Sequence, residues 1–162
     1  MAHTIAILGV TGALGSGLAI RWARAGHRII IGSRTLEKAE EAVTALKAQS
    51  PETAAEAMDN AAAAAAGDIV VLTVPYAHQL ATLEGVKESL TGKILIDVTV
   101  PLQPPKVGTV QLPEGGSAAA AAQALLGEEV FVVSAFQDIA ADLLQDPEKV
   151  IECDVLVSGN KK

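Results

Sequence analysis

Near its N-terminus the chain reads Thr4-Ile5-Ala6-Ile7-Leu8-Gly9-Val10-Thr11-Gly12-Ala13-Leu14-Gly15. The apolar start of this run predicts a buried strand, and the glycine-rich remainder, spaced GxxGxxG, leads directly into a helical pattern. The spacing departs from GxGxxG, but the physics is the same, because backbone N–H groups at the positive end of a helix can closely approach a pyrophosphate. We therefore predict dinucleotide binding, with a bare glycine turn as the alternative. The candidate residues in the turn are Gly9, Thr11, Gly12, Ala13, Leu14 and Gly15.

Short apolar strand patterns alternate with helical patterns along the rest of the chain. Strands that are apolar on both faces imply a parallel sheet covered by helices, so we predict an α/β fold of the doubly wound, Rossmann-like type. The predicted strands are residues 4–8, 28–31, 69–74, 93–98 and 130–135. The predicted helices are residues 14–25, 36–47, 60–66, 78–90 and a segment from 118 onward. Asn60 and Ser117 are the expected caps of the third and fifth helices, and Gly67 is expected to end the third.

The residues after the second predicted strand distinguish between the two dinucleotides. NAD sites place an acidic residue here to accept a hydrogen bond from the ribose 2′-hydroxyl. This chain instead reads Gly32-Ser33-Arg34-Thr35, followed by Lys38. Arg34 can stack on adenine or pair with a phosphate, and Ser33 can donate a hydrogen bond. We interpret Ser33, Arg34 and Lys38 as a clamp for the 2′-phosphate of NADP, with a solvated helix start and incidental charges as the alternative.

Three further segments are expected at the carboxyl ends of strands, where doubly wound sheets bind their ligands. They are residues 73–78, 97–101 and 134–138. Val74 and Pro75 are candidates to line the ribose and nicotinamide path, and His78 is either part of the same rim or an ordinary polar residue of a first helical turn. Asp97 could be a base, but we favour a turn-capping role for it. The loop over residues 99–116, with four prolines and no regular element expected, is long enough to be functional.

Composition bounds the class of protein. A chain of 162 residues, 50% of them hydrophobic, predicts one domain over residues 1–162. Its formal net charge of −7 disfavours nucleic acid or an anionic membrane as a partner, and the lack of a signal-peptide pattern predicts a cytoplasmic protein.

The lone Cys153 rules out an internal disulfide and is expected to be buried. Residues 1–36 contain no acid and are expected to receive an anion. Their arginines are Arg21, Arg24, Arg28 and Arg34.

Several catalytic schemes are excluded by their missing residues. The only tyrosine, Tyr76, is followed four positions later by Leu80, which excludes the Tyr-x-x-x-Lys arrangement of short-chain dehydrogenases. GxSxG is absent, no Lys-Ser or Lys-Thr follows the glycines, and no CxxC or HExxH spacing predicts a metal site. What remains is a redox domain without an obvious acid or base. Hydride transfer between two cofactors suits such a domain, because the cofactors carry the chemistry and the protein orients them.

Taken in order, these motifs resemble those of the NADPH-dependent reductases of coenzyme F420, also called F420H2:NADP+ oxidoreductases. The resemblance covers nearly the whole chain and is carried by residues 7–15, 26–27, 31–34, 38–39, 71–75, 78 and 133–136. It implies reversible hydride transfer between C4 of the nicotinamide and C5 of the deazaflavin, with the two rings stacked in a crevice. NADP and coenzyme F420 are therefore the expected cofactors.

The resemblance also implies roles for individual residues. Those that would hold the pyrophosphate are Thr11, Gly12, Ala13 and Leu14, and those for the 2′-phosphate are Ser33, Arg34 and Lys38. The nicotinamide end would be lined by Val74, Pro75 and Ala135. Residues 99–101, the long loop and the helix from Ser117 would face the deazaflavin.

One feature departs from the family pattern. Family members continue past the position matching Lys162 into a C-terminal segment that helps complete the deazaflavin crevice and a homodimer, and we expect that segment to be absent here. Truncation, an omitted tail and a shortened relative that binds NADP without full catalysis remain open. Alternative functions are the nucleotide domain of an imino-acid or β-hydroxyacid reductase, or a non-catalytic NADP-binding module.

Overall fold

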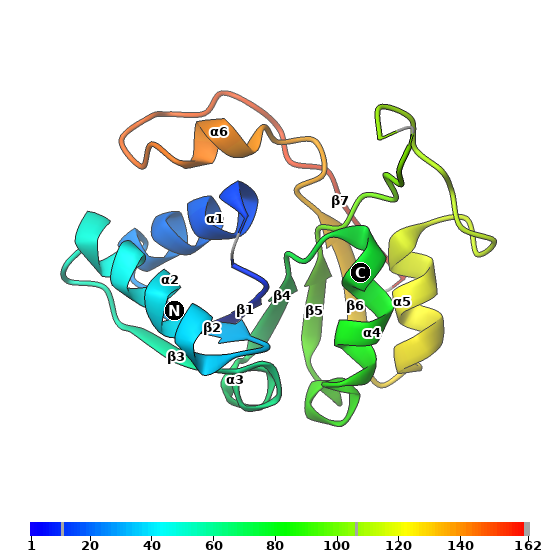
Figure 1. The fold of residues 1–162 in the computed structure, drawn as a ribbon, viewed down its shortest axis with the longest axis horizontal. Helices are drawn as coiled ribbons and strands as arrows, with labels where there is room; N and C mark the ends of the chain where they lie inside the picture. The colour runs from blue at the N-terminus through cyan, green and yellow to red at the C-terminus, as the bar shows by residue number, and fades with distance from the viewer. Residues whose placement is uncertain (11, 106, 161–162) are drawn as a thin grey trace.

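A computed structural model describes residues 1–10, 12–105 and 107–160, and within them the strands form one seven-stranded sheet (Figure 1). The strands are β1 (Thr4–Leu8), β2 (Arg28–Ser33), β3 (Ala55–Asp59), β4 (Ile69–Leu72), β5 (Ile94–Asp97), β6 (Phe131–Ala135) and β7 (Val157–Gly159). Their spatial order is β3-β2-β1-β4-β5-β6-β7, and every neighbouring pair is parallel except β6 with β7. This order confirms the predicted doubly wound, Rossmann-like fold.

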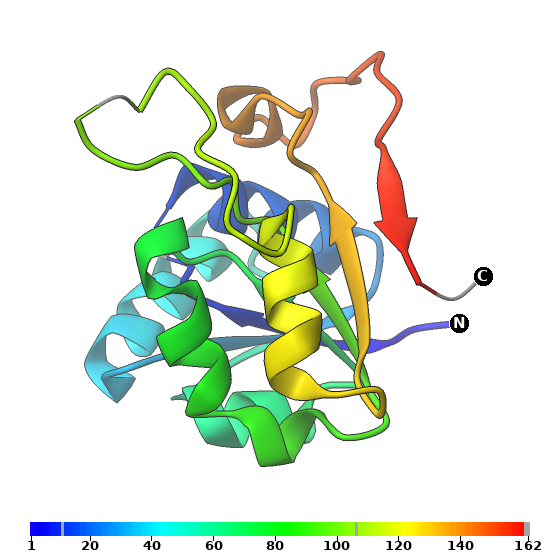
Figure 2. The same cartoon turned by 90° about the vertical axis from the view of Figure 1, so that its right-hand side faces the viewer.

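Helices cover both faces of the sheet, as Figures 1 and 2 show. They are α1 (Ala13–Arg24), α2 (Leu36–Gln49), α3 (Asn60–Ala66), α4 (Gln79–Glu84), α5 (Ala118–Leu126) and α6 (Ala141–Leu144), with 3₁₀ turns at Tyr76–His78 and Lys87–Leu90. The predicted helix over residues 78–90 is thus divided into α4 and its two flanking turns. In Figure 2, α4 and α5 lie side by side on one face, and β7 forms the edge of the sheet.

The core has two halves because successive side chains of a strand point to opposite faces of the sheet. Ile5 and Ile7 of β1 pack on the side of α1 and α2, together with Ile29 and Ile31 of β2. Ala6 and Leu8, the alternate residues of β1, pack on the side of α3, α4 and α5. Both faces of the central strands are therefore buried, which explains why these strands are apolar throughout.

Three elements differ from expectation because the sequence carries little sign of them. β3 reads Ala-Glu-Ala-Met-Asp, which lacks the β-branched residues that favour strands, and it forms by parallel pairing with β2 from Ile29↔Ala55 to Ser33↔Asp59. α6 and β7 are short and lie near the C-terminal end of the chain. In these three places tertiary packing, more than local propensity, decides the structure.

The helix caps follow the sequence in part. Ser117 caps α5 as predicted, since its Oγ accepts a hydrogen bond from the Ala120 N–H at 3.0 Å. Gly67 ends α3, also as predicted. The prediction that Asn60 caps α3 is wrong, because Oδ1 of Asp59 accepts the hydrogen bond from the Ala62 N–H at 2.9 Å. The side chain of Asn60 therefore does not take part in capping α3.

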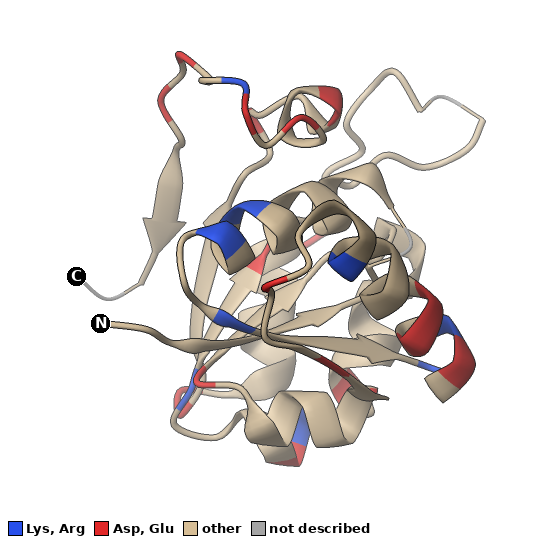
Figure 3. Ribbon diagram, turned by 90° about the vertical axis from the view of Figure 1, so that its left-hand side faces the viewer, with Lys and Arg blue, Asp and Glu red and all other residues tan. Residues whose placement is uncertain are grey.

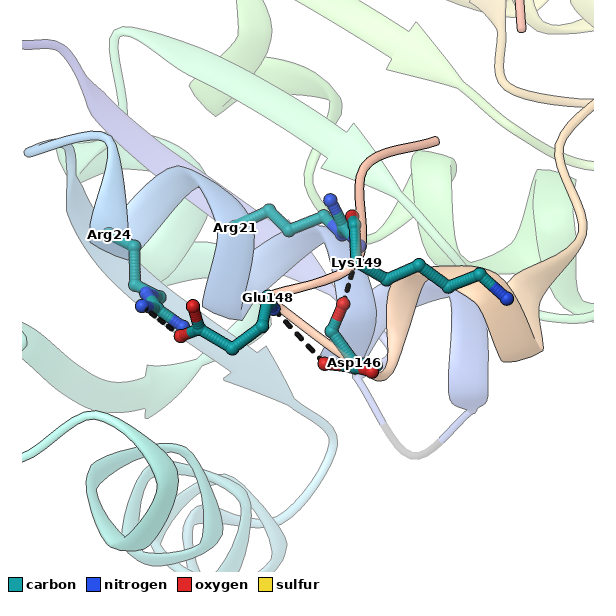
Figure 4. Close-up of polar contacts among 5 residues, drawn as sticks. All are labelled: Arg21, Arg24, Asp146, Glu148 and Lys149. Atoms are coloured by element: carbon teal, nitrogen blue, oxygen red, sulfur yellow. Dashed lines mark hydrogen bonds and ion pairs between the residues drawn. The ribbon is translucent and has the colours of Figure 1, made fainter. Parts of the chain in front are cut away.

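The acid-free N-terminal segment is not a single anion site. Arg21 of α1 donates to the backbone carbonyls of Leu143, Leu144, Asp146 and Lys149, at 2.6–3.1 Å. Arg24 pairs with Glu148, and Arg28 pairs with Glu56 at 2.7 Å. Figure 4 shows Arg21 and Arg24 beside the segment that follows α6, and Figure 3 shows acidic positions on that segment near the basic ones of α1. The expectation of an anion site is therefore wrong for these three arginines and leaves only Arg34.

Cys153 is exposed, so the expectation of a buried thiol is wrong. It lies in an irregular stretch before β7, where no helix or strand covers it.

Across residues 1–10, 12–105 and 107–160, no helix is long and apolar enough to cross a membrane, and no cluster of three or more metal-ligating side chains occurs.

Candidate functional site

A cavity of about 580 Å³ lies at the carboxyl ends of β1, β2 and β4. β1 is the strand at which the chain order of the sheet reverses, and doubly wound sheets bind ligands beside such a switch point. Gly9 follows β1, Ser33 ends β2 and Val74 follows β4, so adjacent strands bring distant parts of the sequence together. The predicted binding residues that line this cavity are Gly9, Ser33, Arg34, Lys38, Val74, Pro75 and His78.

Gly9 fits its position for two geometric reasons. Its φ of +91° is rarely adopted by residues with a side chain, and its N–H donates to the Gly32 carbonyl at 3.2 Å. A Cβ added to Gly9 would lie 2.5 Å from Cγ1 and 3.1 Å from the backbone nitrogen of Val74. The first glycine of the turn therefore lets the chain leave β1 in close contact with the segment that follows β4.

Gly15 brings the first helix close to the sheet. A Cβ on Gly15 would come within 2.7 Å of Oγ1 of Thr73, which itself donates to the Leu8 carbonyl at 3.0 Å. Gly12, by contrast, has no atom within 4 Å of an added Cβ and is exposed at the N-cap of α1. The middle glycine of the motif therefore faces open space, where a ligand can approach the backbone.

Some predicted site residues are not among those that line the cavity. Gly12, Ala13, Leu14 and Gly15 lie at the start of α1, whose first turn contains no acidic side chain. Ala135 is buried at the carboxyl end of β6, two strands away from β4. Thr11 falls outside the described residues. The binding roles of all these residues stay predictions.

The charges around the cavity suit an anion. Arg34 and Lys38 line it and are exposed, and none of its described lining residues is acidic. Within residues 1–10, 12–105 and 107–160 the ion pairs are Arg24 with Glu148 and Arg28 with Glu56, so the cations at the cavity have no carboxylate partner. A phosphate at this end would thus find two cations and the hydroxyl group of Ser33.

Sequence reasoning missed part of the cavity wall. Ala81, Thr82 and Gly85 come from α4 and its C-cap, and their i, i+1, i+4 spacing places small side chains on one side of the helix. From that spacing alone, this side of the helix could have been predicted to line a ligand cavity. Asn60 also lines the cavity, and its sequence context suggested only a helix cap.

Asp97 has the turn-capping role that we favoured. Its Oδ1 accepts from the Thr99 N–H at 2.9 Å, and its Oδ2 accepts from Nε2 of Gln79 at 2.5 Å. Nε2 of Gln79 also donates to the Ala118 carbonyl at 2.9 Å, so this amide joins α4, β5 and α5. Burial raises the pKa of the Asp97 carboxyl, because desolvation disfavours its charged form.

The raised pKa of Asp97 predicts a pH-dependent stability. The folded chain holds this proton more tightly than the unfolded chain, so the free energy of unfolding falls as pH rises from the ordinary value of 3.8 through the raised one. We expect Asp97→Asn to remove this dependence, so that wild type loses stability relative to the variant as pH rises above the ordinary value of 3.8. Urea unfolding across that range measures the difference, and a difference that stays constant with pH contradicts the prediction.

The strand order and the glycine turn at the switch point define a Rossmann-type α/β protein, the class that typically binds dinucleotides. The family described as "NADP oxidoreductase coenzyme F420-dependent" matches residues 4–101. The chain belongs to this family. It is 43% identical over 163 residues to the F420-dependent NADP reductase of Methanocaldococcus jannaschii, covering 96% of this chain and 72% of that protein.

Two other relatives agree with this assignment. The F420-dependent NADP reductase of Methanothermobacter thermautotrophicus is 38% identical, with 100% of this chain and 72% of that protein covered. The crystal structure of a putative F420-dependent NADP reductase from Arthrobacter sp. FB24 superposes with a TM-score of 0.80 at 30% identity, covering 99% of this chain and 74% of that one. The resemblance found in the motifs is confirmed.

Proposed function

We propose that this chain is an oxidoreductase that transfers a hydride between NADP(H) and the deazaflavin coenzyme F420, with the dinucleotide bound in the cavity at the switch point. The observation that carries the proposal is that Arg34 and Lys38 line this cavity and that none of its described lining residues is acidic. The chain also belongs to the family of F420-dependent NADP oxidoreductases. This function is favoured over a domain of an imino-acid or β-hydroxyacid reductase, because the relatives at 43% and 38% identity are F420-dependent NADP reductases.

The residues present suit NADP at each of its parts. The N-terminus of α1, with Gly12 open to space, would receive the pyrophosphate through backbone N–H groups. Ala13 and Leu14 begin the same helix, and Thr11 precedes Gly12 in the sequence. Ser33, Arg34 and Lys38 would hold the 2′-phosphate. The small residues of α4 leave room for the adenosine.

The chain itself does little chemistry in this proposal. Bound NADPH supplies a hydride from C4 of its nicotinamide, and coenzyme F420 accepts it at C5. The protein holds the two rings in contact and excludes water, which turns an encounter of two solutes into an intramolecular step. Val74, Pro75, His78 and Ala135 would line the nicotinamide end. Reduction of the deazaflavin also takes up one proton, which the solvent can supply, so no side chain has to donate it.

The loop over residues 99–116 is the proposed wall on the deazaflavin side. Its described part contains an isolated bridge between Leu102 and Val110 and no helix or longer strand. Leu102, Val110 and Leu112 are exposed there, by 40%, 49% and 69%. Exposed apolar side chains in a loop that follows the carboxyl end of β5 support contact with a planar ring.

Other expectations stay predictions. A homodimer is implied by the resemblance for chains that carry the family's C-terminal segment, and sedimentation of the purified protein would test it. A single domain and the lack of a nucleic-acid partner rest on composition and charge alone. A cytoplasmic location is likewise a prediction from the sequence.

Replacement of Arg34 tests the dinucleotide choice. We expect Arg34→Ala to raise the Kd for NADPH by about ten- to hundredfold, because a charge-assisted contact with the 2′-phosphate is lost, and to leave the Kd for NADH within about twofold. Calorimetric titration measures both constants. Arg24→Ala is the matched control, because Arg24 pairs with Glu148 and does not line the cavity. Equal weakening of NADPH and NADH would contradict the clamp.

A further inference from the structure

Asn60 is a polar residue of the cavity to which the proposed function assigns no role. It is the first residue of α3 and follows Asp59, whose partner across the sheet is Ser33. Its Oδ1 lies 3.1 Å from the position that a Cβ on Gly32 would take. Asn60 therefore sits beside the end of β2, next to the residues proposed to hold the 2′-phosphate.

The two ends of the Asn60 amide have different surroundings. Oδ1 is buried and has no hydrogen-bond partner among the residues that the structure describes. The amide nitrogen makes no hydrogen bond within those residues either, but it is not one of the buried unpartnered atoms. Since Asn60 lines the cavity, this nitrogen is the polar atom that its side chain can offer to a ligand there.

The helix does not need this side chain. Asp59 already caps α3 by accepting from the Ala62 N–H. An asparagine whose amide neither caps a helix nor pairs with a described neighbour leaves hydrogen-bonding capacity unused, which is uncommon for a half-buried amide. A ligand in the cavity would use it.

We propose that Asn60 adds to the preference for NADP over NAD, by donating a hydrogen bond from Nδ2 to the 2′-phosphate held by Ser33, Arg34 and Lys38. The inference rests on the proposed function, because it names a further residue of the same site. An N–H donor complements a phosphate, which offers only acceptors when fully ionised. A carboxylate at this position would repel the phosphate and would instead accept from the 2′-hydroxyl of NAD.

The test compares two substitutions at one position. Asn60→Ala is expected to raise the Kd for NADPH about tenfold and to leave the Kd for NADH within about twofold. Asn60→Asp has the same shape but adds a negative charge, so it is expected to weaken NADPH about tenfold further and to strengthen NADH. Calorimetric titration with each dinucleotide gives the four constants, and thermal unfolding without ligand verifies that both variants are folded.

Ala61→Asp is the matched control, because it adds the same charge one residue later at an exposed position that does not line the cavity. It is expected to leave the ratio of the two Kd values unchanged. Equal effects of the Asn60 variants on NADPH and NADH, or an Ala61→Asp effect as large as that of Asn60→Asp, would overturn the inference. A wild-type chain that binds neither dinucleotide would instead contradict the proposed function.

Discussion

Gly9→Ala is expected to destabilise the fold by about 2–5 kcal/mol and to abolish measurable NADPH binding at micromolar dinucleotide. A side chain at a φ of +91° costs about 1–2 kcal/mol, and a Cβ only 2.5 Å from Cγ1 of Val74 adds about 1–3 kcal/mol of overlap. Relief of that overlap requires the turn to move away from the segment after β4. Because both segments line the cavity, the same movement distorts the site.

Gly26→Ala separates the two causes. Gly26 has nearly the same φ, +88°, but an added Cβ there would meet nothing within 4 Å. This control is expected to cost only about 1–2 kcal/mol and to leave NADPH binding intact. Urea unfolding and calorimetric titration measure the two effects. If both alanine variants lose the same stability and both bind NADPH, the close approach of Gly9 to Val74 has no energetic importance.

Arg21→Met is expected to release the segment that follows β6 from α1. The guanidinium of Arg21 donates to four backbone carbonyls of residues 143–149, and two of these bonds are partly buried. Methionine keeps much of the apolar stem but supplies no donor. At about 1 to 1.5 kcal/mol for each of the two partly buried bonds, opening becomes about 2–3 kcal/mol easier, and amide exchange over residues 141–150 accelerates about 30- to 150-fold.

Arg24→Met is the control for this effect. Arg24 lies one turn further along α1 and pairs with Glu148, but the two side chains are 40% and 76% exposed. An exposed ion pair contributes less than about 1 kcal/mol, so amide exchange is expected to change less than about fivefold. Hydrogen exchange followed by mass spectrometry resolves the segment. Equal acceleration in the two variants would show that charge on α1, and not the carbonyl contacts of Arg21, holds the segment.

The release of this segment also affects the glycine turn. Gly17 lacks a Cβ where Leu144 packs against α1, and the Gln145 amide donates to the Ala13 carbonyl and to Oγ of Ser16. The first turn of α1 is therefore supported from the C-terminal part of the chain. We expect Arg21→Met to weaken NADPH binding only modestly, since the turn itself keeps its glycines.

The central sheet could be predicted because its strands are buried on both faces and are apolar without interruption. β3 could not, because Ala55–Asp59 becomes a strand only through its pairing with β2. The glycine turn was predicted from its spacing, which reflects local backbone requirements, and Arg34 from its place after the second predicted strand. By contrast, the sequence does not distinguish Arg21, which binds carbonyls, from Arg34, which faces the cavity, because the partner of a cation is set by the tertiary structure.

The cap of α3 illustrates the same limit at a single position. Asp59 and Asn60 are both residue types that favour N-caps, and they are adjacent in the sequence. The end of β3 at Asp59 fixes which of them begins the helix. That one-residue difference frees the side chain of Asn60 to line the cavity.

The most direct test of the proposed reaction is the absorbance of oxidised coenzyme F420 mixed with the purified chain and either NADPH or NADH. We predict bleaching of the deazaflavin with NADPH, a much weaker response with NADH, and a raised KM for NADPH in Arg34→Ala. A folded sample that binds NADPH but leaves the deazaflavin absorbance unchanged would contradict hydride transfer to coenzyme F420.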